Sequence, residues 1–186
     1  MKPVGAAKVP VLGADFPAPL ALAPTLAQLA GLVLDCDGVL TPGDLYFDEG
    51  GRRLLRFCSR DGLGLAHLIG QGIRVAVLSG RPTDIAEARL RELGVVDFVG
   101  RCRDKGAGLR ALCAGWQLPP AAVAFVGDDL PDLAAFAVAG LAVAVADAAA
   151  PLLARAHWVT RARGGRGAVR EICEAILMAQ GRWQVG

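Results

Sequence analysis

Short apolar runs alternate with helix-period segments from residue 32 onward. The apolar runs are almost wholly hydrophobic, as expected for strands that helices cover on both faces of a sheet. They occupy residues 32–34, 74–78, 97–99, 123–126, 141–145 and 157–160, and the helix-period segments occupy residues 62–71, 82–93, 105–114, 130–138 and 167–178. Strands and helices in alternation predict an α/β fold with a doubly wound parallel sheet.

Residues 44–57 depart from this alternation. Two apolar stretches, Leu45-Tyr46-Phe47 and Leu54-Leu55-Arg56-Phe57, flank the turn sequence Asp48-Glu49-Gly50-Gly51. This pattern predicts a β-hairpin inserted after the first strand. We interpret residues 1–18, which contain prolines at positions 10 and 17, as a mobile leader. Residues 19–186 are then predicted to form a single domain, because one domain usually takes roughly 100 to 200 residues.

The composition excludes several classes of protein. The 20 Lys and Arg residues nearly balance the 18 Asp and Glu residues, so the chain lacks the concentrated positive charge of a nucleic-acid-binding protein. No apolar run reaches the roughly 18 residues that span a membrane. The five cysteines are odd in number and widely spaced, which favours reduced thiols over disulfides. We therefore expect a cytoplasmic protein that uses neither nucleic acid nor membrane as a partner.

The first predicted strand ends in a pair of acids. Asp35-Cys36-Asp37-Gly38 follows the strand directly, and the carboxyl ends of parallel strands are where open α/β sheets bind ligands. Asp37 is expected in the turn that leaves the sheet, which Gly38 permits. Two neighbouring carboxylates repel each other, and a hard divalent cation is the natural compensation.

Three further polar motifs follow later strands. Ser79-Gly80-Arg81 precedes a helix, and a helix amino terminus suits phosphate. Lys105 opens another helix, and Gly127-Asp128-Asp129 with Asp132 forms a second acidic cluster. Each motif alone also fits a structural role, such as a turn, a helix cap or a solvated lysine. In this order, however, all of them are predicted to converge on one edge of the sheet.

These motifs resemble the four motifs of the haloacid dehalogenase-like (HAD) phosphatase superfamily. The resemblance implies that Asp35 is the nucleophile and that Asp37 acts first as general acid and then as general base. It implies a Mg²⁺ ion held by Asp35, the backbone carbonyl of Asp37, and Asp128. It also assigns phosphoryl binding to Ser79, Gly80 and Lys105, and support of the metal and the lysine to Asp129 and Asp132.

The spacing of these motifs leaves no room for the separate cap domain that most of the superfamily carries. Residues 35–41, Arg60-Asp61-Gly62 and residues 164–171 resemble the 3-deoxy-D-manno-octulosonate 8-phosphate (KDO 8-phosphate) phosphatase family, and this likeness runs from about residue 20 to 181. The resemblance implies Mg²⁺-dependent hydrolysis of that sugar phosphate in lipopolysaccharide precursor biosynthesis, by a homotetramer with the hairpins at its centre. The substrate contacts that it implies are Cys58, Ser59, Arg60, Asp61, Gly62, Arg81 and Arg89.

Two departures from the family pattern bear on the substrate. Cys58-Ser59 stands where Asn-Val is usual, and Ala66 stands where relatives can carry arginine. The Ala66 departure predicts weaker substrate binding than in a typical relative, without a change in substrate class. A related nine-carbon sugar-acid phosphate, or a broader range of sugar phosphates, is the alternative substrate. An inactive HAD-like binding domain and a phosphorylatable receiver domain are alternatives of other classes. The complete set of expected catalytic groups speaks against the inactive domain, and the Asp-x-Asp-Gly motif and the late Gly-Asp-Asp cluster speak against the receiver domain.

Overall fold

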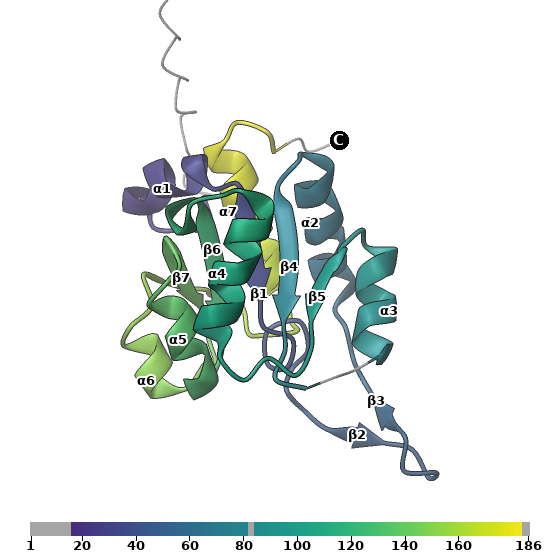
Figure 1. The fold of residues 1–186 in the computed structure, drawn as a ribbon. Helices are drawn as coiled ribbons and strands as arrows, with labels where there is room; N and C mark the ends of the chain where they lie inside the picture. Colours follow the sequence, from purple (N-terminus) through teal and green to yellow (C-terminus); the bar gives the residue numbers. More distant parts are fainter. Residues whose placement is uncertain (1–15, 82–83, 184–186) are drawn as a thin grey trace, which may run out of the picture.

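A computed structural model of the chain describes residues 16–81 and 84–183. Its centre is a six-stranded sheet in the order β5-β4-β1-β6-β7-β8, in which every pair of neighbours is parallel (Figure 1). The strands are β1 (Gly31–Leu34), β4 (Arg74–Leu78), β5 (Asp97–Val99), β6 (Val123–Gly127), β7 (Leu141–Ala144) and β8 (Trp158–Val159). All carboxyl ends therefore meet at one edge of the sheet, the lower edge in Figure 1.

Helices cover both faces of this sheet. In Figure 1, α4 lies in front of the sheet and α7 behind it, and α7 packs against α1 and α2. The α-helices are α1 (Ala23–Gln28), α2 (Ser59–Gly70), α3 (Asp84–Glu92), α4 (Lys105–Trp116), α5 (Leu133–Phe136), α6 (Ala150–Leu153) and α7 (Ala168–Ala179). Short 3₁₀ helices are η1 (Leu20–Leu22), η2 (Pro120–Ala122) and η3 (Leu130–Asp132). The predicted doubly wound α/β fold is confirmed.

The element boundaries differ from the prediction at a few places. Helix α2 begins at Ser59 instead of residue 62, and the extended Cys58 is its N-cap residue. The helix predicted over residues 130–138 divides into η3 and α5, and the Asp129 side chain caps the first of these. The two short helices α1 and α6 were not predicted. Each contains a proline in its first turn and is too short for a helix period to show.

The amino-terminal boundary of the domain also needs correction. Residues 1–15 of the predicted leader lie outside the described residues. Phe16 and Ala18, however, are only 6% and 7% exposed and pack in the hydrophobic core. Burial of a phenylalanine side chain stabilises a fold by about 1.5–3 kcal/mol. The folded domain therefore includes residues 16–18, and a leader that extends to residue 18 was wrong at these three positions.

The predicted hairpin projects from the lower edge of the molecule, and we call residues 44–57 the arm (Figure 1). Strands β2 (Tyr46–Phe47) and β3 (Arg53–Leu54) pair antiparallel, with Tyr46 opposite Leu54 and Phe47 opposite Arg53. Four large apolar side chains of the arm are exposed, at Leu45, Tyr46, Phe47 and Leu54. An isolated two-stranded ribbon is marginally stable in water, so an apolar ribbon of this kind calls for a partner surface.

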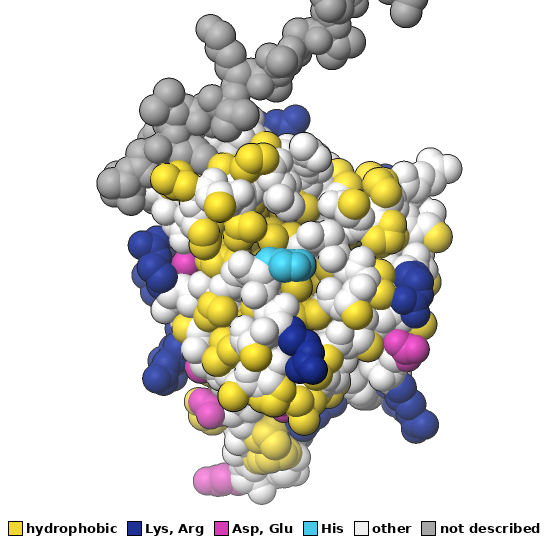
Figure 2. All heavy atoms as spheres, turned by 90° about the vertical axis from the view of Figure 1, so that its left-hand side faces the viewer, with side chains coloured by type: hydrophobic (Ala, Val, Ile, Leu, Met, Phe, Trp, Pro, Cys, Tyr) yellow, Lys and Arg dark blue, Asp and Glu magenta, His cyan; other side chains and the backbone are white. Residues whose placement is uncertain are grey.

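The surface shows no single concentrated charge on the face drawn in Figure 2, where basic and acidic side chains are scattered among apolar ones and the arm extends at the bottom. Among the residues that the structure describes, no helix combines the length and apolarity needed to cross a membrane. All five cysteines are free thiols, as predicted from their number and spacing.

Candidate active site

The first acidic motif lies where β1 leaves the sheet. Asp35 follows the last residue of β1 and is buried, and the chain then turns through Asp37 and Gly38. Gly38 has a φ of 90°, and a Cβ at this position would overlap the carboxylate of Asp128. Only glycine permits both this backbone conformation and the close approach of the two acidic loops. The expected turn at Gly38 is therefore required by the packing of the site.

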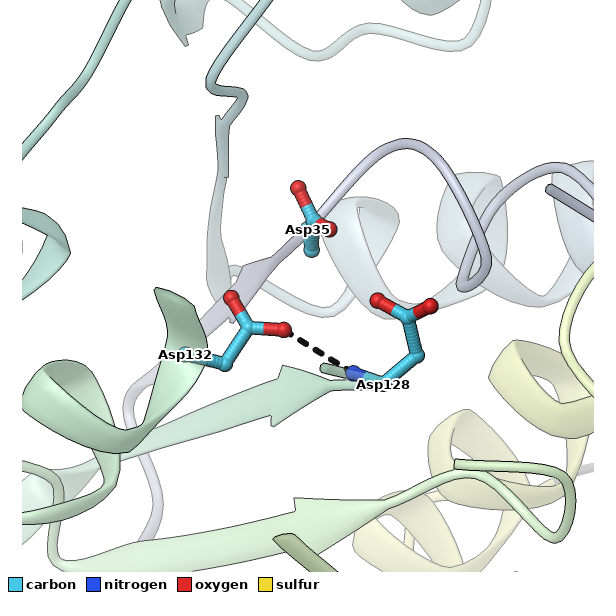
Figure 3. A group of neighbouring side chains, drawn as sticks. All are labelled: Asp35, Asp128 and Asp132. Carbon is cyan, nitrogen blue, oxygen red and sulfur yellow. Dashed lines mark hydrogen bonds between the residues drawn. The ribbon is translucent and has the colours of Figure 1, made fainter. Parts of the chain in front are cut away.

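Three acids from the segments that follow the neighbouring strands β1 and β6 meet at this edge. Carboxylate oxygens of Asp35, Asp128 and Asp132 lie within 4.8 Å of one another (Figure 3). Of the three side chains, Asp132 accepts the most hydrogen bonds. Its Oδ1 is 2.5 Å from Lys105 Nζ, and its Oδ2 accepts hydrogen bonds from the backbone N–H groups of Asp128 and Asp129 at 2.9 and 3.3 Å. Asp132 therefore orients its neighbours, and Asp35 and Asp128 are the better placed metal ligands.

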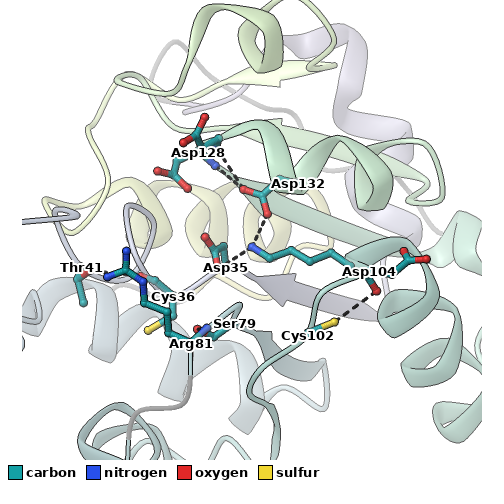
Figure 4. A network of polar contacts seen from close by, with 11 residues as sticks. Asp35, Cys36, Thr41, Ser79, Arg81, Cys102, Asp104, Asp128 and Asp132 are labelled. Carbon is teal, nitrogen blue, oxygen red and sulfur yellow. Dashed lines mark hydrogen bonds and ion pairs between the residues drawn. The ribbon is translucent and has the colours of Figure 1, made fainter.

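Lys105 connects the nucleophile position to this cluster. It is the first residue of α4 and is 3% exposed, and the helix is capped by Asp104, which accepts a hydrogen bond from Ala107 N–H. Its Nζ lies 2.8 Å from Asp35 Oδ1 and 2.5 Å from Asp132 Oδ1. Figure 4 shows the carboxylates of Asp35 and Asp132, with dashed lines at these two contacts. Burial would lower the pKa of Lys105, but the two carboxylates outweigh burial and raise it. The ammonium group is thus held charged beside Asp35.

Burial and mutual repulsion disfavour the charged forms of Asp35 and Asp128. Burial raises the pKa of Asp35 to about 6, although Lys105 opposes this. Burial, followed by the charges of Asp35 and Asp132, raises the pKa of Asp128 to about 8. A cation bound between Asp35 and Asp128 would remove much of this cost, because it offsets the mutual repulsion. The donors are all oxygens, which fits a hard cation such as Mg²⁺.

A pocket of about 300 Å³ opens above these acids. It is lined by Asp35, Asp37, Gly43, Gly80, Arg81, Cys102, Lys105, Asp128, Asp129, Pro131 and Asp132. The four sequence motifs thus contribute to one cavity, as expected from their positions after parallel strands. Its volume is at the lower end of the range for small-molecule sites.

Two predicted residues hold the loops of the pocket in place through hydrogen bonds to the backbone. Ser79 is buried, and its Oγ accepts a hydrogen bond from Arg81 N–H at 3.1 Å, which fixes the Gly80-Arg81 turn at the pocket. Asp129 is exposed, and its Oδ1 accepts a hydrogen bond from Leu130 N–H at 2.7 Å. Asp129 therefore supports the acidic loop by capping η3.

Comparison with known proteins identifies the family. A model of haloacid dehalogenase-like hydrolases matches residues 59–140. The chain is 44% identical over 154 residues to the 3-deoxy-D-manno-octulosonate 8-phosphate phosphatase of Yersinia pestis, which covers 83% of this chain and 82% of that protein. The chain belongs to the KDO 8-phosphate phosphatase family of haloacid dehalogenase-like hydrolases.

Solved structures of the family agree with this fold. The KDO 8-phosphate phosphatase of Moraxella catarrhalis, in complex with magnesium ion, phosphate ion and KDO, superposes with a TM-score of 0.84 at 33% identity, over 87% of this chain and 92% of that one. The crystal structure of the Yersinia pestis enzyme gives a TM-score of 0.84 at 42% identity, over 87% of each chain.

The residues that the family resemblance assigns to substrate contacts do not converge on the pocket as the four motifs do. Of these residues, only Arg81 lines the pocket. Arg60 is exposed in the first turn of α2, where Cys58, Ser59 and Gly62 also lie. Arg89 on α3 pairs with Glu92 at 2.9 Å and lies beside Gly62, where a Cβ would meet Arg89 Nη2 at 2.9 Å. Apart from Arg81, these residues therefore lie outside the pocket lining.

Asp61 has a different environment from the one expected. Its side chain is buried, and its two carboxylate oxygens accept hydrogen bonds from Gly167 N–H at 3.1 Å and Arg170 N–H at 2.8 Å. These donors belong to the amino-terminal end of α7, where backbone N–H groups lack helical partners. The geometry thus argues against a sugar contact for Asp61 and assigns it to the docking of α7 on α2.

The structure also brings in residues that the sequence did not single out. Arg53 Nη2 lies 2.6 Å from Asp37 Oδ1, although the two residues are 16 apart along the chain and Arg53 is in the arm. Nothing in the sequence sets how the arm folds back over the turn. Gly43, Cys102 and Pro131 line the pocket as well, and only their closeness to the motifs could have indicated this.

Proposed function

We propose that this chain is a Mg²⁺-dependent phosphoric monoester hydrolase that converts KDO 8-phosphate to KDO and phosphate. The observation that carries the proposal is the buried Lys105 between Asp35 and Asp132, beside Asp128, in a pocket open to substrate. A charged lysine and a cation site next to one carboxylate suit the transfer of a phosphoryl group. The identity of 44% to a KDO 8-phosphate phosphatase supports the substrate.

The reaction divides into two displacements on phosphorus. In the first, an oxygen of Asp35 forms a bond to phosphorus as the bond between phosphorus and the sugar oxygen breaks. The departing sugar oxygen takes a proton from Asp37. In the second, water attacks phosphorus and gives a proton to Asp37 as the bond to Asp35 breaks, which releases phosphate. A carboxylate nucleophile makes each step easier than direct hydrolysis.

The surrounding groups manage charge and orientation. Mg²⁺, held by Asp35, Asp128 and the backbone carbonyl of Asp37, would supply positive charge beside the phosphoryl oxygens. Lys105 offsets charge on the same oxygens, and the Gly80-Arg81 turn, fixed by Ser79, offers backbone and guanidinium donors. Asp132 keeps Lys105 in place, and Asp129 caps the helix that carries Asp132.

Recognition of the sugar requires groups in addition to those that bind the phosphoryl group. A guanidinium can grip the substrate carboxylate with two hydrogen bonds, and we assign this role to Arg81 together with Arg60 and Arg89. Cys58, Ser59 and Gly62 would line the same surface. The protein acts as a homotetramer in which the apolar arms pack together and a neighbouring subunit helps to close each site. The five free cysteines agree with a reducing, cytoplasmic location.

A phosphate-release assay over sugar phosphates tests this function. With Mg²⁺, kcat/KM for KDO 8-phosphate should exceed that for glucose 6-phosphate by about ten- to a hundredfold or more, because glucose has no carboxylate for the arginines. EDTA should abolish turnover. Equal values for the two sugars would refute the substrate, and a preference for a nine-carbon sugar-acid phosphate would replace it. Absence of release from every sugar phosphate would favour an inactive binding domain.

A further inference from the structure

One ion pair joins the arm to the turn that carries Asp37. Arg53, on β3, places Nη2 2.6 Å from Asp37 Oδ1, and the two side chains are only 20% and 24% exposed. Among the described residues, this is the only ion pair between the arm and the rest of the chain. Because both partners are largely shielded from water, the contact is stronger than an exposed surface pair.

The neighbouring arginine of the arm behaves differently. Arg52 has an 86% exposed side chain and pairs with Asp48 inside the hairpin at 2.6 Å. Arg53 instead is the cross-strand partner of Phe47. Its Nε is buried and has no hydrogen-bond partner in the described part of the chain. Arg52 precedes β3 and pairs within the hairpin, whereas Arg53, on the strand, reaches the turn that carries Asp37. A half-buried arginine whose Nε is unpaired needs the charge of Asp37.

Asp37 also faces the pocket, where the leaving oxygen of the substrate must lie. Oδ1 is taken by Arg53, and the hydrogen bonds of the described residues give Oδ2 no partner. We propose that Arg53 is a positioning residue for Asp37, which fixes one carboxylate oxygen so that the other is available for proton transfer. This inference rests on the proposed function, in which Asp37 serves both displacements. It also ties the chemistry to the arm, since a shift of the arm moves Arg53.

Single-turnover kinetics with two leaving groups test the proposal. A sugar oxygen needs a proton from Asp37 as it leaves, whereas p-nitrophenolate leaves without one. With enzyme in excess, the release of p-nitrophenolate reports the first displacement alone, and steady-state turnover also includes the water step. The variants are Arg53→Ala and Arg53→Lys, and Arg52→Ala is the matched control in the same arm.

We expect Arg53→Ala to lower kcat for KDO 8-phosphate about tenfold to a hundredfold, the usual effect of a misplaced catalytic group, with little change in KM. Release of p-nitrophenolate in a single turnover should keep its wild-type rate, but steady-state turnover of the same compound should slow. Arg53→Lys, which keeps the charge, should recover part of the loss. Arg52→Ala should match the wild type throughout.

Equal losses for both leaving groups and both displacements would overturn the proposal, as would a change confined to KM or kinetics identical to those of Arg52→Ala. Light scattering on each variant separates loss of assembly from loss of positioning. If the Arg53→Ala oligomer dissociates, the Arg53→Lys variant is tested by the same comparison of leaving groups and displacements. If the wild type hydrolyses p-nitrophenyl phosphate but not KDO 8-phosphate, the substrate assignment is wrong. The comparison of the two displacements with p-nitrophenyl phosphate then still tests the role of Arg53.

Discussion

At the scale of single residues, Asp35 is the group on which the chemistry depends. Asn has nearly the same size and keeps one oxygen, but its amide is a poor nucleophile. Asp35→Asn should therefore lower phosphate release at least about a hundredfold, as removal of a nucleophile commonly does. Lys105 retains its second partner, Asp132, so the fold should survive. Phosphate release and thermal melting of the purified variant check both statements, and residual activity above a few per cent would contradict the covalent mechanism.

Asp61 carries a structural prediction. Asp61→Ala leaves two N–H groups of the α7 amino terminus without an acceptor, and such a loss costs about 1–3 kcal/mol per buried group. The melting temperature of this variant should fall by several degrees. Arg60→Ala is the control, because Arg60 is the exposed neighbour on the same helix turn. A normal melting temperature with reduced kcat/KM for KDO 8-phosphate would instead return Asp61 to substrate binding.

At the scale of elements, the arm should hold the assembly together. Phe47 and Leu54 are 61% and 51% exposed on strands of two residues each, and such a ribbon gains stability mainly from a partner. The double variant Phe47→Ser and Leu54→Ser should lower the molar mass in solution from that of a tetramer. Val96→Ser is the control, since Val96 is 73% exposed outside the arm. Light scattering at micromolar concentration checks this, and a wild type that is monomeric would disprove the tetramer.

At the scale of the whole molecule, cation binding should stabilise the fold. A ligand at a hundredfold excess over its dissociation constant adds about 2.7 kcal/mol, because it binds only the folded state. For a chain of this size, such a gain raises the melting temperature by several degrees. Thermal melting with Mg²⁺ and with EDTA should show this difference. Asp128→Asn should reduce it, whereas Glu49→Gln, in the exposed turn of the arm, should not. An equal shift in both variants would place the ion elsewhere.

The sequence by itself determined the sheet and the meeting of its motifs. A wholly apolar run between helix-period segments specifies a buried parallel strand, and parallel strands end at one edge. Asp35, Lys105 and Asp128 each follow or adjoin such a strand end, so their convergence needed no tertiary information. Gly38 was equally readable, because a turn after the first acid pair required it.

Only the tertiary structure decided how side chains from separate elements divide their partners. The pairing of Arg53 with Asp37 depends on how the arm folds back, and the burial of Asp61 depends on the packing of α2 against α7. Phe16 likewise joins the core through contacts that no local pattern records. Periodicity describes which face of an element is apolar. The choice of a partner for a polar group is instead made by packing, which brings together residues far apart in the chain and removes the competing water.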